Sequence, residues 1–196
     1  MNAFNLKDIK SLTYQRPEIQ NGYANQTLCV DITDADITIK PVSDEMKQIF
    51  VGGKGFDLWL LWHAVSGTTQ WTDPENAICM ASGPMGGTPS YPGSGKSIVT
   101  ALSPLTGSVI DSNVGGYFGP YLKFSGFDAL EIQGQASRDV VIYIDGISET
   151  VTIFEAEGLP EDAYEISSVL TRHFGNEKPR GISVVSTGPG AKNSLM

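Results

Sequence analysis

The sequence has little basic charge, few cysteines and no long hydrophobic run. Its 196 residues carry 13 Lys and Arg against 22 Asp and Glu, which gives a net charge of −9. Binding to nucleic acid or to an anionic membrane surface depends on basic residues, so the composition argues against both partners. The longest apolar-rich stretch, residues 56–65, covers about half of a membrane span. The polar first twenty residues lack the apolar region of a signal peptide, so we expect a cytoplasmic protein.

Cysteine and histidine are also scarce. Cys29 and Cys79 lie in predicted strands far apart in the sequence, so we expect buried free thiols. Two cysteines cannot ligate an iron–sulfur cluster or a four-cysteine zinc site. His63 and His173 each lie on an apolar face of a predicted helix, where a packed core histidine is more common than a catalytic base. We therefore interpret both as core residues.

The other polar residues form no recognisable catalytic group. Asp57 and Asp128 have no partner that spacing identifies, and Ser82 and Ser97 lie outside any Gly-x-Ser-x-Gly motif. No acid–base pair, nucleophile triad or metal cage follows from the sequence.

Periodicity predicts a chain that mixes strands and helices. Alternating patterns predict hairpins over 27–40 and 140–154, and helical patterns predict helices over 43–51, 56–65 and 160–174. Further strands are predicted over 76–81, 97–102, 107–111, 128–133 and 181–187, with a short helix over 117–124. Residues 1–21 show no clear period, and we interpret them as an N-terminal extension before a single domain over 22–196.

The order of these elements shows an internal repeat. A hairpin, a helical segment, a strand and a Gly-Pro loop occur over 28–84 and again over 140–189. Val30-Asp31 matches Ile144-Asp145, and each final strand runs into a Gly-Pro pair. From the sequence alone, duplication and chance similarity both explain the pattern. A duplicated fold would suit a pseudo-symmetric ligand, with one Gly-Pro loop in each half.

Glycine is over-represented, with 22 residues in 196 against a usual ~7%. Residues 90–97 nearly spell a nucleotide-binding P-loop, but Ser90 replaces the required glycine and the β-branched run after Lys96 predicts a strand instead of a helix. The loops at 83–95 and 113–116 are therefore either tight turns of a glycine-rich β domain or a surface where backbone approaches a ligand. Antiparallel pairing of 97–102 with 107–111 predicts that Lys96 and Asn113 lie close together.

Six ordered motifs resemble the N-terminal domain of tungsten-containing aldehyde:ferredoxin oxidoreductases over residues 22–193. They are Val51–Gly55, Ala81–Thr88, Pro92–Lys96, Ser103–Gly107, Asp111–Gly119 and Leu122–Ala129. The resemblance implies an α+β fold whose two sheets form a base for a bis-molybdopterin cofactor. The dithiolene sulfurs of that cofactor bind tungsten or molybdenum, and a magnesium ion lies between the pterin phosphates. It also implies oxidation of an aldehyde to a carboxylic acid, with electrons passing through one [4Fe-4S] cluster to ferredoxin.

The same resemblance suggests cofactor-binding residues. Lys96 stands where the family usually has an arginine between pterin and cluster, and Asn113 stands where a main-chain carbonyl binds magnesium. Gly115 stands where the backbone meets the pterin, and the neighbouring Gly95 and Gly116 complete the expected set. Lysine keeps the positive charge but lacks the planar fork of arginine.

The family continues well beyond the matched region, into parts that carry the cluster cysteines and the second pterin loop. We therefore expect the cofactor platform of an aldehyde oxidoreductase that is incomplete on its own, whether as a fragment, a stand-alone paralogue or a subunit of a split enzyme. Its expected partners are the C-terminal domains or a separate subunit, a second copy of the chain, and ferredoxin in the full enzyme. Any [4Fe-4S] cluster then needs cysteines from elsewhere. The alternative is a non-catalytic scaffold or binding subunit that keeps the fold without the cofactor.

Overall fold

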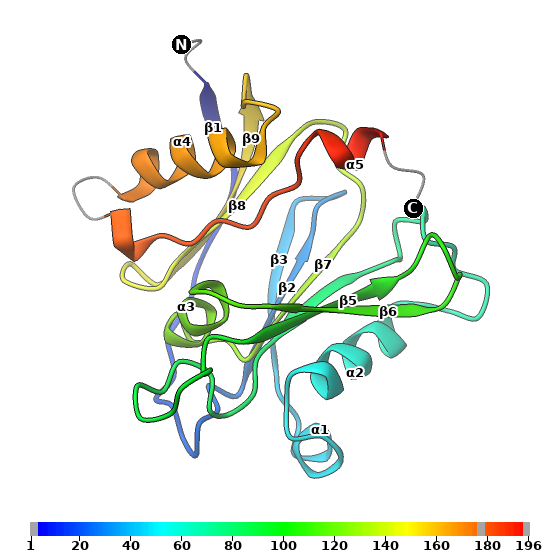
Figure 1. The fold of residues 1–196 in the computed structure, drawn as a ribbon, viewed down its shortest axis with the longest axis vertical. Helices are drawn as coiled ribbons and strands as arrows, with labels where there is room; N and C mark the ends of the chain where they lie inside the picture. The colour runs from blue at the N-terminus through cyan, green and yellow to red at the C-terminus, as the bar shows by residue number, and fades with distance from the viewer. Residues whose placement is uncertain (1–3, 176–178, 194–196) are drawn as a thin grey trace.

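The computed structural model describes residues 4–175 and 179–193, which form a six-stranded and a three-stranded β-sheet with helices around them (Figure 1). This confirms the predicted α+β class with two sheets. The strands are β1 (Asn5–Thr13), β2 (Gln26–Asp31), β3 (Asp36–Pro41), β4 (Ile78–Ala81), β5 (Ser97–Leu102), β6 (Val109–Val114), β7 (Ala129–Gln133), β8 (Val140–Asp145) and β9 (Thr150–Glu157). The helices are α1 (Asp44–Ile49), α2 (Lys54–Ala64), α3 (Phe118–Phe124), α4 (Ala163–Gly175) and α5 (Pro189–Asn193), with a 3-10 turn at Pro179–Gly181.

The six-stranded sheet has the order β3-β2-β7-β4-β5-β6. Strands β2 and β7 run parallel, and every other neighbouring pair is antiparallel. Strand β2 is paired on both edges and is almost completely buried, with Leu28 at 0% and Val30 at 2% exposure. Its apolar run is typical of a strand that is covered on both faces, as expected near the centre of the protein.

The three-stranded sheet has the order β1-β9-β8, with both pairs antiparallel. Strand β1 pairs with β9 from Asn5↔Glu157 to Thr13↔Thr150. The N-terminal segment, interpreted above as an extension, therefore supplies a strand of the sheet. Its side chains are mostly exposed, which explains why it shows no apolar period in the sequence.

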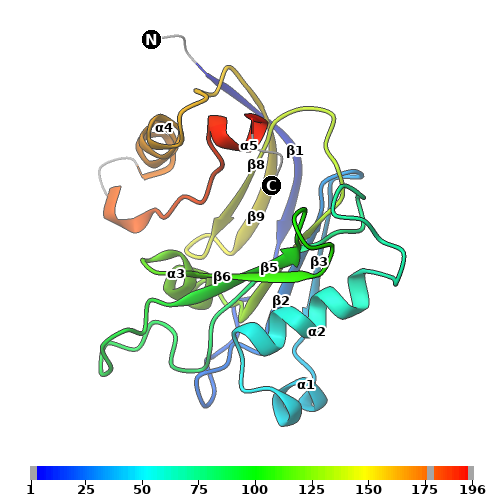
Figure 2. The ribbon, with the colours of Figure 1, turned by 45° about the vertical axis from the view of Figure 1, so that its right-hand side comes forward.

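Two apolar clusters hold the layers together. One lies between the sheets and combines Leu28, Val30 and Leu130 of the larger sheet with Val151 and Ile153 of the smaller one. The other lies on the opposite face of the larger sheet and includes Met46 of α1 together with Phe56, Leu60 and Leu61 of α2. Figure 2 shows the resulting order of smaller sheet, larger sheet and α2 with α1.

The two predicted hairpins have the same turn geometry. In the first, Asp31 Oδ1 accepts hydrogen bonds from the backbone N–H groups of Thr33 and Asp34. In the second, Asp145 Oδ1 accepts from Ile147 and Ser148. Four residues after each aspartate a non-glycine residue has positive φ, with Ala35 at 52° and Glu149 at 55°. Strand pairing then resumes at Asp31↔Asp36 and Asp145↔Thr150, so the structure supports the hairpin part of the internal repeat.

The helices also follow local sequence signals. The Ser43 side chain caps α1 by accepting a hydrogen bond from the Met46 N–H, as its position predicts. Asp162 likewise accepts from Tyr164 and Glu165 at the start of α4. None of the helices in the described part of the chain is long and apolar enough to cross a membrane.

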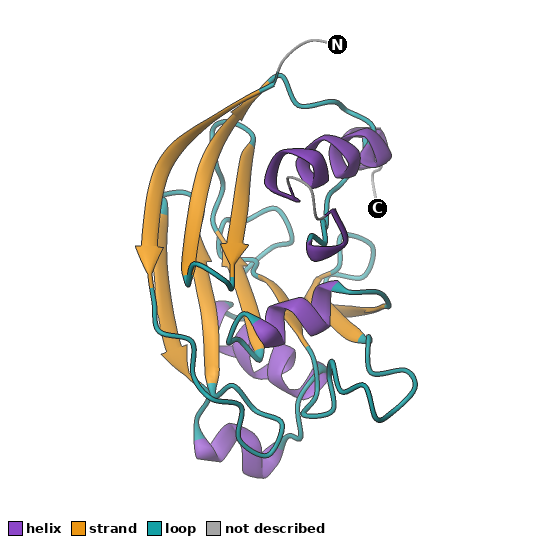
Figure 3. Cartoon of the chain, turned by 90° about the vertical axis from the view of Figure 1, so that its left-hand side faces the viewer, coloured by secondary structure: helices purple, strands orange, loops and turns teal. Residues whose placement is uncertain are grey.

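The strand predicted over 181–187 is absent from the structure. Gly181 closes a 3-10 turn, and residues 182–188 run as an unpaired segment, drawn as loop in Figure 3. The prediction was wrong because an apolar β-branched run forms a strand only beside a hydrogen-bonding neighbour, and a cavity separates this segment from β8.

Candidate functional site

The β5–β6 hairpin brings the two glycine loops to one edge of the larger sheet. Ser97 pairs with Val114 and Ile98 pairs with Asn113, so Lys96 and Gly115 adjoin the same end of the ladder. This confirms the predicted proximity of Lys96 and Asn113. Strand β6 begins and ends later than the predicted 107–111, since it runs over Val109–Val114, and Asn113 and Val114 are its last residues instead of loop residues.

The loops touch through their backbones. A Cβ atom added to Gly95 would lie 2.6 Å from the Gly116 carbonyl oxygen, and Gly116 itself has a φ of +106°. Only glycine fits such an approach and such a φ without displacing the backbone. Gly95 and Gly116 therefore fix the distance between the loops, and the exposed Asn113 and Gly115 lie beside this contact.

Lys96 is an exposed cation at this edge. In the described part of the chain, its ammonium group makes no ion pair and no hydrogen bond. The nearby Lys54 at the start of α2 differs, since its Nζ lies 2.6 Å from Asp111 Oδ1 of β6. The structure thus leaves Lys96 free for an external anion, whereas Lys54 ties α2 to the sheet.

The beginning of the long glycine loop is fixed by three close backbone contacts. A Cβ atom on Gly22 would lie 2.2 Å from the Pro84 carbonyl oxygen, and one on Gly52 would lie 3.0 Å from Gly83 Cα. The Gly53 N–H donates to the Ser82 carbonyl oxygen at 3.2 Å. These contacts hold the start of the loop, residues 82–84, against residues 22 and 52–53.

A buried ion pair that the sequence did not reveal holds Gly22 in this position. Lys123 and Asp128 are 2% and 0% exposed, and the Lys123 ammonium donates to Asp128 and to the Gly22 carbonyl oxygen. Asp128 also accepts from the N–H groups of Ala24 and Asn25. The interpretation of Asp128 as isolated was wrong. The five-residue spacing from Lys123 gives no signal, since the pair forms across the turn between α3 and β7.

Asp57 of α2 is a second buried acid. Its Oδ2 accepts from the Thr100 hydroxyl at 3.2 Å, while Oδ1 has no hydrogen-bond partner among the described residues. Removal from water raises the pKa of Asp57 to about 8, against a smaller lowering effect of the Thr100 hydrogen bond and a small further increase from Asp111. Asp57 is therefore largely protonated in the folded protein at neutral pH.

Cys29 and Cys79 are both free and buried, as predicted. They lie opposite Glu131 of β7 from its two sides, in β2 and β4. Burial raises the pKa of Cys29 to about 11 and raises the pKa of Cys79 still further, so both remain thiols. Within residues 4–175 and 179–193 no group of three or more His, Cys, Asp or Glu side chains is arranged to hold a metal.

The two histidines were placed wrongly by the sequence reasoning, because both are exposed. His63 Nδ1 donates to the Trp59 carbonyl oxygen at 2.7 Å, and its ring lies 4.8 Å from the Trp59 ring. His173 lies 4.8 Å from the Phe174 ring, measured between centroids. Each histidine thus contacts an aromatic ring at the helix surface and does not lie in the core.

Comparison with known proteins identifies the family. The model of the aldehyde ferredoxin oxidoreductase N-terminal domain matches residues 27–196. A tungsten-containing aldehyde ferredoxin oxidoreductase of Pyrococcus furiosus is 33% identical over 165 residues, which cover 84% of this chain and 26% of that protein. The chain thus spans about a quarter of the length of the curated relatives that it matches.

Relatives with other names share the domain. The WOR-like subunit of an aliphatic sulfonate oxidoreductase from Pyrococcus furiosus is 31% identical over 138 residues, covering 69% of this chain and 21% of that protein. A solved structure, the active site complex BamBC of benzoyl coenzyme A reductase with 1,5-dienoyl-CoA, matches with a TM-score of 0.73 and 28% identity over 78% of this chain and 23% of that one. From the model match and these identities, the chain belongs to the aldehyde ferredoxin oxidoreductase family and corresponds to its N-terminal domain.

Proposed function

We propose that this chain is the cofactor platform of a tungsten or molybdenum bis-pterin oxidoreductase, which oxidises an aldehyde to a carboxylate and passes the electrons to ferredoxin. The family membership and the tungsten-containing relatives support the cofactor class. Relatives named for an aliphatic sulfonate and for benzoyl coenzyme A carry the same domain. The platform is therefore compatible with several substrate classes.

The proposal rests on one observation: Lys96 lies beside the second glycine loop at one edge of the larger sheet. A pterin phosphate needs a cation and closely approaching backbone. This edge offers the Lys96 ammonium group, which has no partner among the described residues, beside the Gly95–Gly116 contact. Asn113 lies on β6, the outer strand of the sheet, where alternate carbonyl oxygens point away from β5. A main-chain carbonyl of such a strand suits magnesium, which prefers oxygen ligands.

The residues of this chain would hold and orient the cofactor, while the bound tungsten–pterin group supplies the two-electron oxidation chemistry. No side-chain ligand to tungsten is required of this chain in the proposal, because the pterin sulfurs bind the metal. Cys29 and Cys79 are buried thiols of raised pKa, so the four thiolates of a [4Fe-4S] cluster must come from elsewhere in the enzyme.

Metal and pterin analysis of the intact oxidoreductase, purified from cells supplied with tungstate, tests the proposal. We expect tungsten or molybdenum and pterin in amounts proportional to this chain, together with aldehyde-dependent reduction of ferredoxin. A folded, fully assembled protein without metal and without pterin would instead identify the scaffold or binding subunit that keeps the fold alone. Metal and pterin without aldehyde oxidation would retain the platform and reject the aldehyde.

A further inference from the structure

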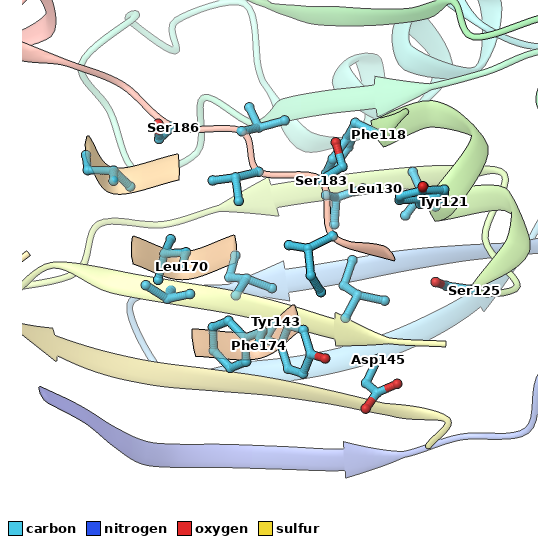
Figure 4. A pocket seen from close by; sticks show the side chains of 18 of the residues that line it. Phe118, Tyr121, Ser125, Leu130, Tyr143, Asp145, Leu170, Phe174, Ser183 and Ser186 are labelled. Carbon is cyan, nitrogen blue, oxygen red and sulfur yellow. The ribbon is translucent and has the colours of Figure 1, made fainter. Parts of the chain in front are cut away.

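Strand β1 precedes the part of the chain that the family model matches, since that match covers residues 27–196. It forms the outer strand of the smaller sheet, beside β9. Figure 4 shows this order, with β1 as the lowest strand beyond β9 and with the pocket on the β8 side of the sheet. Strand β1 therefore lies outside the matched domain and adds one strand to its smaller sheet.

The side chains of β1 contribute little to the core. Only Leu6 and Leu12 are half-buried, and the other seven residues of the strand are exposed. Burial of apolar side chains is the main favourable term in folding. The main contribution of β1 is therefore its backbone ladder with β9, which runs from Asn5↔Glu157 to Thr13↔Thr150.

The chain is anchored to the core just after β1. The buried Tyr14 donates its hydroxyl to the Ser125 carbonyl oxygen at 2.6 Å and its N–H to the Glu149 carbonyl oxygen at 2.9 Å. At the other end of the strand, the Phe4 ring contacts the exposed His173 of α4, with 5.3 Å between the centroids. Strand β1 can thus leave β9 while the Tyr14 anchor stays in place.

Strand β9 has no protective feature of its own. Its residues Thr150–Phe154 are all uncharged and favour strands, and its charged residues are confined to the last three positions. Edge strands avoid pairing with other chains through lysine, proline, bulges or short length. Strand β9 is eight residues long, contains neither lysine nor proline, and pairs with β8 without a register shift. An uncovered strand of this composition is a typical site of association.

The equivalent strand of the first hairpin is protected by its own sequence. Strand β3 corresponds to β9 through the shared turn geometry, and it is the outer strand of the larger sheet beside β2. It has six residues and ends in Lys40 and Pro41, which are both exposed. The open edge is tolerated at β3 for this reason, whereas the protection of β9 comes from β1.

Strand β1 carries the features that β9 lacks. Lys7 and Lys10 are exposed, and the register with β9 shifts between Asp8 and Lys10, which places Ile9 in a β-bulge. Lysines and bulges both disfavour pairing with a further strand. Strand β1 thus replaces an edge that is suited to pairing with one that is protected.

We infer that β1 covers a self-association edge, and that the partner it excludes is a second copy of this protein joined through β9. Strand β1 runs antiparallel to β9, so the β9 edge accepts an antiparallel neighbour. Two β9 strands related by a two-fold axis also pair antiparallel. Such pairing satisfies the same backbone groups of β9 that β1 satisfies now. The inference does not depend on the proposed cofactor.

Proline at two adjacent positions of β1 tests the inference in the intact oxidoreductase. Neighbouring N–H groups of a strand point to opposite edges, so Lys10→Pro with Ser11→Pro removes one N–H that faces β9. We expect this variant to stay folded, to release β1 and to form a species of about twice the wild-type mass in light scattering. The matched control is Lys10→Ala with Ser11→Ala, which removes the same side chains, keeps both N–H groups and should behave as the wild type.

Hydrogen–deuterium exchange locates the new contact. At low protein concentration, the β9 amides of the proline variant should exchange about tenfold or more faster than in the wild type, and they should regain protection as the concentration rises. A further substitution, Thr150→Lys, adds a protective lysine to the uncovered edge. It should return the proline variant to the wild-type mass.

Three outcomes would overturn the inference. The first is a proline variant that unfolds, with the β2 amides unprotected, because β1 would then be required for the fold and would not be a cover. The second is a folded variant that keeps the wild-type mass at every concentration. The third is association that leaves β9 unprotected or that Thr150→Lys does not reverse, since the contact would then lie elsewhere.

Discussion

Hairpins β2–β3 and β8–β9 share their turn geometry, yet the sheets around them differ in width. Strand β2 belongs to a six-stranded sheet and Leu28 is completely buried. Its counterpart in β8, Ile142, is only half-buried at the edge of a three-stranded sheet. The difference shows that the same local sequence pattern gives a finished core only where its neighbouring strands are present.

The larger sheet also carries the buried polar contacts that position the candidate site. Lys123, Asp128 and Asp57 all lie in or against the larger sheet. The ion pair between Arg138 and Glu155 of the smaller sheet lies mostly at the surface, with Arg138 72% exposed. Substitutions in the larger sheet should therefore cost more stability than comparable substitutions in the smaller sheet.

The largest difference should come from the two ion pairs. Asp128→Asn leaves the Lys123 charge buried, so we expect a loss of about 3–5 kcal/mol in the free energy of unfolding. Glu155→Gln should cost at most about 1 kcal/mol, because its partner is exposed to water. Denaturant unfolding of both variants measures the difference. Equal losses would contradict the claim that the buried Lys123–Asp128 pair stabilises the fold more than the exposed Arg138–Glu155 pair.

Core truncation at equivalent positions should give the next largest contrast. We expect Leu28→Ala to cost about 2–5 kcal/mol in the 196-residue chain, since it opens a cavity in a packed core. Ile142→Ala should cost about 1–2 kcal/mol there, because its side chain already borders open space. Denaturant unfolding of both variants measures the contrast, and equal losses would contradict the difference between a packed core and a half-buried edge strand.

Replacement of the buried acid should give a pH-dependent gain. The folded-state pKa of Asp57, about 8, lies above its ordinary value of 3.8. The unfolded chain therefore releases this proton first, and stability falls as the pH rises from about 4 to 8. Asp57→Asn should remove this slope and stabilise the protein by about 1–3 kcal/mol at pH 7, with little change at pH 4.

Thermal unfolding of Asp57→Asn across this pH range provides the measurement. Asp111→Asn is a suitable control for lost charge, although it also frees Lys54. An Asp57→Asn variant that is less stable than the wild type at pH 7 and at pH 4 alike would show that its carboxyl group has a structural role that the amide cannot replace.

The smallest effect should be the same in both halves. Ala35 and Glu149 have positive φ, a conformation that disfavours residues with a Cβ atom. Ala35→Gly and Glu149→Gly should each change stability by less than about 1 kcal/mol in the same direction, since glycine relieves the backbone strain. Opposite signs in matched unfolding experiments would weaken the equivalence of the two hairpins.

The sequence predicted the elements whose signals are local. The alternation in β2, β3, β8 and β9, the Ser43 cap and the antiparallel β5–β6 pair that adjoins Lys96 all follow from nearby residues. The near P-loop was also excluded correctly, because Lys96 precedes strand β5 and not a helix.

Other features depend on contacts that local patterns do not contain. Strand β1 lacks apolar alternation because its faces are mostly exposed, and it is fixed by pairing with β9. The Lys123–Asp128 pair is defined by the backbone of 22–25, which is distant in sequence. Residues 182–187 have a strand-like sequence, but none of the described strands pairs with them. The role of Lys96, Asn113, Gly95, Gly115 and Gly116 stays a prediction.

The central claim is that the edge beside Lys96 faces the cofactor. The most direct test is the tungsten and pterin content of the intact oxidoreductase with Lys96→Ala, Lys96→Arg or, as a control on the exposed strand β1, Lys7→Ala. A charge-assisted hydrogen bond in a dry site contributes about 1.5–3 kcal/mol, so Lys96→Ala should lower cofactor retention roughly ten- to a hundredfold. Lys96→Arg and Lys7→Ala should retain the cofactor. Equal cofactor content in the wild type and Lys96→Ala would contradict the account and leave these glycine loops as turns.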